Sequence, residues 1–265
     1  MDLAQYFTEF IIYSFLGWIW ESIYCTIKEK RWQDRGFLFG PICPIYGSVV
    51  VITSIVFKEF PVLTDPDFPI WAVFLICMLG SAVAEYATSW FLEKRFHARW
   101  WDYSNIPLNI NGRICIPASL GFGLAGILIV KYLIPAVSDM HSLISPLFYE
   151  FSSLIFAIML GADLALTESS LSALLKQVED MHNEFNEKAQ ENYEKMAEAP
   201  RIFGKRIKEM TSYVRMLGQG QRSILKKIKL MPDTKHTDIQ NISRIAFWQS
   251  LKDAAHTISK GRDLR

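Results

Sequence analysis

Five long apolar runs constrain this chain most, because each is long enough to cross a lipid bilayer as a helix. They cover roughly residues 6–27, 39–58, 70–92, 114–135 and 147–166. A hydrocarbon core about 30 Å thick needs about 20 mostly apolar residues per helix. The sequence therefore predicts an all-α polytopic membrane protein with five transmembrane helices in the lipid bilayer. We expect the first helix to stay in the mature protein, since no basic segment precedes it.

Charged residues are segregated along the chain and divide it in two. Residues 1–167 hold 10 Lys and Arg and 14 Asp and Glu, whereas residues 168–265 hold 18 and 13. We predict a transmembrane domain over the first range and a helical cytoplasmic tail over the second. Basic residues gather in the loops after the first and third runs, and such loops face the cytoplasm. The N-terminus is therefore expected outside and the tail inside.

The segment EKRW, residues 29–32, returns as EKRF at residues 93–96. The register that aligns these two segments also places Glu21 on Glu85. We interpret this as an internal repeat. A simpler explanation also stays open, since basic residues commonly follow a membrane helix for topological reasons.

A second register, shifted further by one insertion in the loop after the third run, extends the match. It aligns GFLFGPICPIYG at 36–47 with GRICIPASLGFG at 112–123. The repeat units then cover about residues 6–60 and 70–135, and the fifth helix stands alone. Helices 1–2 and 3–4 would form parallel two-helix units related by a pseudo-twofold axis along the membrane normal.

Glu21 and Glu85 are the first candidate site residues. Each lies about seven residues, or roughly 10 Å, from the cytoplasmic end of its helix. An ionisable group inside the bilayer costs about 2.5–3.5 kcal/mol on insertion scales. We therefore expect both side chains to face the bundle interior, a partner or water.

Helices 2 and 4 enter the membrane from that same side through segments rich in Gly and Pro. The helix-breaking residues are Gly36, Pro41, Gly47, Gly112, Pro117 and Gly123. Broken backbone inside a membrane is tolerated only where it is buried in protein or lines a wet cavity. We therefore expect a polar cavity on the cytoplasmic side. Its candidate binding residues are Glu21, Glu85, Arg113, Asp102, Tyr46 and Ser119.

Structural explanations stay open for the same residues. The glutamates could cap a neighbouring helix or pair with Arg113, and the Gly and Pro residues could serve close packing. In a mixed interpretation, Arg113 neutralises one glutamate and leaves the other to titrate. Asp102 lies in an aromatic loop that could be an interfacial belt or a substrate gate. Asp163 ranks lower, since it need only reach water at its helix end.

Motifs of soluble catalysis are missing from the sequence. It contains no GxxxxGK[ST] phosphate loop, no HExxH and no GxSxG. The four cysteines lie in or beside apolar runs without a CxxC pair, so we expect no metal site, no cofactor and no disulfide framework. A net charge of +1 and no basic groove with aromatic residues disfavour a nucleic-acid partner.

The tail carries two patterns. Between residues 162 and 199 there is no Gly or Pro, and apolar residues recur every three or four positions. These residues are Leu171, Leu174, Val178, Met181, Phe185, Ala189, Tyr193 and Met196. The fifth helix is expected to continue into the cytoplasm and to form a coiled coil or pack on a later tail helix. The basic segment 201–230 could lie on the anionic inner leaflet or pair with the acidic helix.

Three motifs give the chain a family resemblance. GWIWESIY, RGFLFGPICPIYG and WDYSNIPLNINGRICIPASLGFG resemble those of a bacterial membrane family, the CmpB-type ABC-transporter permeases, over about residues 10–135. The resemblance implies a permease of the bacterial cytoplasmic membrane that works with a separate ATP-binding subunit. Five spans would need a dimer or partner for a full pathway, so we expect a homodimer.

Three functional hypotheses are compatible with these features. The leading one is a permease-like subunit whose cytoplasmic-side cavity contains Glu21 and Glu85. The alternative is an intramembrane lipid-binding protein or lipid-modifying enzyme, with one glutamate as a general base and Arg113 holding an anionic head group. The third is a membrane scaffold that acts through its tail.

Overall fold

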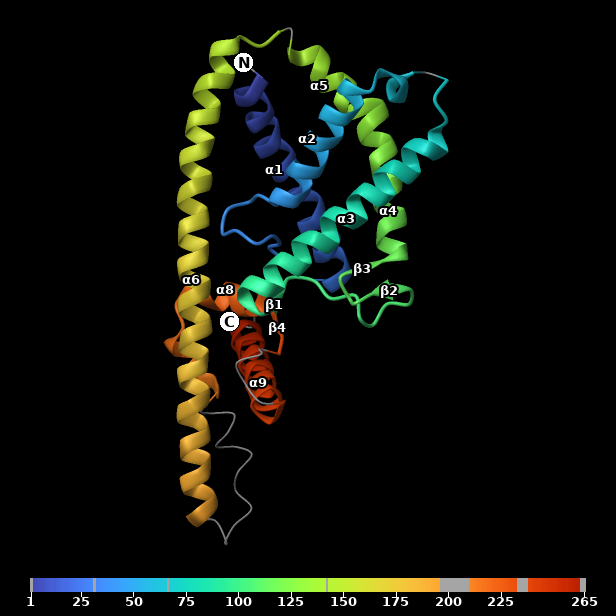
Figure 1. The fold of residues 1–265 in the computed structure, drawn as a ribbon. Helices are drawn as coiled ribbons and strands as arrows, with labels where there is room; N and C mark the ends of the chain where they lie inside the picture. The colour runs from blue at the N-terminus through green and yellow to red at the C-terminus, as the bar shows by residue number, and fades with distance from the viewer. Residues whose placement is uncertain are drawn as a thin grey trace. The chain divides into compact units, whose positions relative to one another are not determined.

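The computed structural model describes residues 2–30, 32–65, 67–141, 143–195, 210–232 and 238–262. Helices dominate the described residues (Figure 1), so the predicted all-α class is confirmed. The chain forms two compact units. The first consists of Met1–Phe91 and Trp101–Ala165, and the second of Leu92–Trp100 and Leu166–Arg265.

The first unit is built from long helices joined by two structured loops. Its elements are α1 (Asp2–Glu29), α2 (Pro44–Glu59), a short 3₁₀ helix (Pro61–Thr64), α3 (Ile70–Phe96), β2 (Asn109–Ile110), β3 (Ile114–Cys115), α4 (Ile116–Leu128), a π-helical turn (Ile129–Leu133), α5 (Ile134–His141) and the start of α6 (Pro146–Lys195). Four helical stretches are long and apolar enough to cross a membrane. They are Leu3–Glu29, Ile70–Phe96, Ile116–His141 and Pro146–Glu184.

The second apolar run differs from the prediction. Residues 39–43 are not helical, and α2 has 16 residues, about 24 Å at 1.5 Å per residue. Pro44 stands in the first turn of α2, where its missing N–H costs nothing, and the chain before it cannot continue the helix. The fifth span thus stays a prediction.

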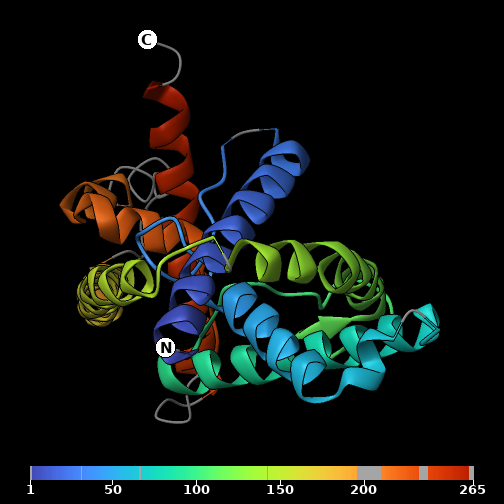
Figure 2. The ribbon, with the colours of Figure 1, turned by 90° about the horizontal axis from the view of Figure 1, so that it is seen from above.

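Glycine allows α1 and α2 to approach closely, and the two helices lie side by side (Figure 2). A Cβ atom added to Gly17 would lie 2.4 Å from the Tyr46 Cβ, and one on Gly47 would lie 2.2 Å from the Phe10 carbonyl oxygen. Neither position has room for a larger residue. Beyond this contact, Phe57, Val73 and Val130 form a small apolar core.

The second unit joins the end of α3 to the tail. Its elements besides α6 are β1 (Ala98–Arg99), α8 (Gln219–Lys227), β4 (Lys229–Leu230) and α9 (Asp238–Arg262). β1 pairs antiparallel with β4, with Ala98 opposite Leu230, and the Met231 N–H donates to the His97 carbonyl at 2.7 Å. The sequence did not predict this pairing, because a strand of two residues has no periodic pattern.

The continuation of the fifth helix is confirmed, since α6 runs unbroken to Lys195. Leu171, Leu174, Val178 and Met181 are all buried within the chain. Val178 lines a small cavity together with Trp248 on α9, and the His182 ring lies 5.4 Å from the Phe247 ring on the same helix. This part of the stripe therefore packs on the tail itself. The side chains of the other four stripe positions, and residues 201–209 of the basic segment, lie outside the described residues.

Candidate functional site

The two predicted glutamates belong to one polar cluster in the first unit. Glu21 lies in the last third of α1 and Glu85 in the second half of α3. The charges of both act on the Tyr103 hydroxyl, and both also act on the Tyr46 hydroxyl at the start of α2. The expectation that both carboxylates face one polar cavity stays a prediction. Their binding role is taken up below as a proposal.

Glu21 is neutralised by an arginine from the loop that follows its own helix. Arg35 Nε donates to Glu21 Oε1 at 3.1 Å, and Cys43 Sγ approaches Oε2 at 3.8 Å. Burial lowers the pKa of the Arg35 guanidinium, but the charge and hydrogen bond of Glu21, together with the nearby Cys25 and Cys43, outweigh burial and the pKa rises. Arg35 therefore stays protonated and forms a stable ion pair with Glu21.

Glu85 has a different environment. Its side chain is 6% exposed, and Tyr103 Oη donates to Oε1 at 2.8 Å. The second oxygen, Oε2, is buried and accepts no hydrogen bond from the residues that the structure describes. Burial, and then the adjacent Glu85 charge, raise the pKa of the Tyr103 hydroxyl, which therefore remains a donor.

A folded loop holds Tyr103 in place. The Tyr103 N–H donates to the Gly112 carbonyl at 2.8 Å, and Trp101 Nε1 donates to the Arg113 carbonyl at 2.9 Å. Gly112 has φ +68°, a left-handed conformation that favours glycine. The pairing of β2 with β3 completes the loop. The loop for which an interfacial belt and a substrate gate were both open is thus ordered, and it delivers one hydroxyl to Glu85.

Arg113 and Asp102 are close to the cluster in sequence but have local partners. The Arg113 guanidinium lies 5.2 Å from the centroid of the Tyr86 ring, and its Nη1 is 3.4 Å from the Tyr86 hydroxyl. Asp102 accepts the Ser104 N–H at 3.1 Å in a tight turn. The arginine paired with a glutamate is therefore Arg35 rather than the predicted Arg113, and the neutralised glutamate is Glu21.

Asp163 on α6 binds the irregular backbone before α2. Its Oδ1 accepts the Phe39 N–H at 3.1 Å and its Oδ2 accepts the Gly40 N–H at 2.9 Å. A Cβ on Gly40 would lie 2.6 Å from Oδ2, so a larger residue here would displace the Asp163 carboxylate. Sequence reasoning ranked Asp163 too low. The available signal was an acid within an apolar run, since such a group needs polar partners.

Residues 8–168 match the family model described as "Putative ABC-transporter type IV". This match covers more than half of the 265-residue chain. The chain belongs to this ABC-transporter family. No curated protein and no solved structure shows a significant match. Together with the four long apolar helices, the family identifies the chain as a membrane protein and a component of a transport system.

The ABC-transporter family region contains all of the predicted helix-breaking residues, which have different roles in its two halves. Gly36, with φ +97°, and Pro41 lie in non-helical backbone. In the second half only Gly112 lies in non-helical backbone. Helix α4 already begins at Ile116, so Pro117 stands in its first turn and Gly123 lies inside the helix. The expected breaks at Pro117 and Gly123 are therefore wrong, since proline is tolerated in a first helical turn. The expected break at Gly47 is wrong too, because Gly47 lies inside α2. Ser119 is buried in α4.

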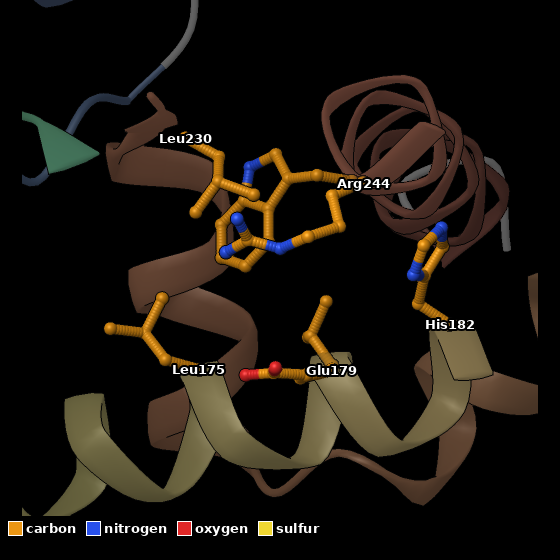
Figure 3. A pocket seen from close by; sticks show the side chains of 7 residues that line it. Leu175, Glu179, His182, Leu230 and Arg244 are labelled. Carbon is orange, nitrogen blue, oxygen red and sulfur yellow. The ribbon is translucent and has the colours of Figure 1, made fainter. Parts of the chain in front are cut away.

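A small cavity lies in the second unit, outside the ABC-transporter family region. Figure 3 shows Glu179 and His182 on α6 opposite Arg244 on α9, with Leu175 and Leu230 beside them. Its volume of about 10 Å³ is close to that of one water molecule. The cavity is therefore a packing feature of the tail and not a substrate site.

Proposed function

We propose that the chain is a permease-like subunit of an ABC-type transporter, and that Glu85 contacts the transported substrate in a polar cavity on the cytoplasmic side. The observation that carries the proposal is the Glu85 carboxylate, 6% exposed, with a buried oxygen that accepts no described hydrogen bond. A buried polar group without a partner costs about 1–3 kcal/mol, so it marks a site where a ligand gains binding energy. Family membership supports the transport role.

The proposal includes five spans and the tandem repeat. Support comes from matching contacts in the two halves. A Cβ on Gly47 would collide with Phe10, and a Cβ on Gly123 would lie 2.6 Å from the Phe74 ring. The register that aligns EKRW with EKRF places Phe10 on Phe74, and the second register places Gly47 on Gly123. Each glycine thus packs against the equivalent position of the preceding helix.

A contact between equivalent residues also supports a pseudo-twofold axis. The second register places Tyr46 on Phe122, and the rings of these two residues lie edge to face with centroids 6.3 Å apart. Residues related by a twofold axis meet each other only near that axis. On this account Glu21 and Glu85 flank the axis, and Arg35 makes the two halves chemically unequal.

The proposed orientation is that given by the positive-inside rule, with the N-terminus outside the bacterial cytoplasmic membrane and the tail inside. The proposed partners are a separate ATP-binding subunit and a second copy of the chain. An ATP-binding partner is proposed because the chain belongs to an ABC-transporter family and its given sequence contains no phosphate-binding loop.

Purification in mild detergent from the native membrane tests this function. We expect mass spectrometry to find an ATP-binding subunit bound at a stoichiometric level. The control is a preparation from cells that lack this chain. Absence of such a subunit, together with a retained anionic lipid, would favour the lipid-binding alternative instead.

A further inference from the structure

The two glutamates of the polar cluster differ in their charged partners, and this difference indicates what the cluster binds. Arg35 is the charge partner of Glu21, with which it forms an ion pair. The groups that act on the Glu85 carboxylate are the Tyr103 hydroxyl, through its hydrogen bond, and the charge of Glu21. Glu85 therefore has a neutral donor and a repelling neighbour, and no cationic side chain among the described residues acts on it.

The negative charge of a carboxylate in this position has to be compensated by a positive charge. An isolated ionised group in a low-dielectric interior is so costly that it either takes up a proton or binds another cation. One of its oxygens already accepts from Tyr103 at 2.8 Å, and the other is buried and open to a new partner. The geometry leaves one coordinating atom for one positively charged group.

We propose that Glu85 is a binding site for a monovalent cation, which is either a proton, a metal ion or the ammonium group of an organic substrate. This inference rests on the proposed transport function and names the class of the transported or co-transported species. The Tyr103 hydroxyl that donates to the carboxylate at 2.8 Å is neutral, so it leaves the negative charge for a cation to balance. Arg35 confines the negative charge to Glu85, so the site takes one cation rather than two.

Thermal unfolding of the detergent-purified full chain tests the inference. The probes are tetramethylammonium chloride and sodium chloride, with ionic strength held constant, and pH is varied in a separate series. A cation that binds only the folded protein raises the midpoint by about 5 °C at 100 times its Kd. We expect Glu85→Gln to lose this shift and Glu150→Gln, the same change at an exposed position, to keep it.

Each outcome has a defined meaning. A shift with tetramethylammonium or sodium that Glu85→Gln removes supports an organic or inorganic cation, and an acid-dependent rise that the same variant removes supports a proton. Identical responses of the wild type and Glu85→Gln to all three would overturn the inference. The permease proposal would survive that result if the ATP-binding subunit still co-purified.

A second measurement needs no variant and so does not depend on folding of Glu85→Gln. Dicyclohexylcarbodiimide modifies protonated carboxyl groups in apolar surroundings, and mass spectrometry of the wild-type protein locates the adduct. We expect modification of Glu85 to slow at least tenfold when the bound cation is present, or to rise as the pH falls if the cation is a proton. A rate independent of cation and of pH would contradict the inference.

Discussion

At the scale of single residues, packing of the first two helices depends on Gly47, because no space is left beside it for a Cβ atom. A Cβ on Gly47 would lie 2.2 Å from the Phe10 carbonyl oxygen, which is backbone and cannot rotate away. We expect Gly47→Ala to lower the free energy of unfolding by about 1–3 kcal/mol through overpacking. Gly80→Ala is the control, since nothing lies within 4 Å of the added carbon. Equal thermal midpoints for the two variants would contradict this close contact.

A second prediction at this scale concerns Asp163, whose two oxygens accept the Phe39 and Gly40 N–H groups. Asp163→Asn keeps one acceptor and places an amide donor against the other N–H. We expect a loss of about 1–3 kcal/mol in stability and faster amide hydrogen exchange at residues 39–40. Asp65→Asn, at an exposed turn where Oδ1 accepts the Asp67 N–H, is the control and should change neither. Unchanged exchange at residues 39–40 would refute the assigned role.

At the scale of elements, the pairing of β1 with β4 fixes the chain segment that follows α3. The Met231 N–H donates to the His97 carbonyl beside this pairing, at 2.7 Å. Met231→Pro removes that donor, so we expect a loss of about 1 kcal/mol and faster exchange at residues 97–100. Met231→Ala keeps the N–H and should exchange like the wild type. The prediction fails if the two variants behave alike.

The helices and loops also show which features of the fold and of the candidate site the sequence predicts and which it does not. The long helices were predictable because about 20 apolar residues in a row have one stable arrangement in a bilayer. Glu21 and Glu85 were recognisable as candidate site residues because an ionisable side chain inside an apolar membrane run is energetically costly and usually has a polar partner or a function. Their partners were not, since Arg35 and Tyr103 depend on how two irregular loops fold back. Local patterns do not encode such tertiary contacts.

At the scale of the whole molecule, the chain has two compact units. Leu251 on α9 is fully buried in the second unit, so Leu251→Ala should cost about 2–5 kcal/mol there. Ile242→Ala, on the same helix but 69% exposed, is the control. We expect limited proteolysis to cleave the tail of Leu251→Ala earlier and to leave the first unit intact. Simultaneous loss of both units would contradict their independence.

The central claim of this account is that Glu85 contacts the species that the transporter moves. The most direct measurement is ATP-dependent accumulation of solutes from a cell extract by vesicles that contain the chain and its ATP-binding partner, with mass spectrometry as the readout. We predict that the wild type and Glu150→Gln accumulate the same solute and that Glu85→Gln accumulates at least tenfold less while still assembling. Undiminished accumulation by Glu85→Gln would contradict the claim.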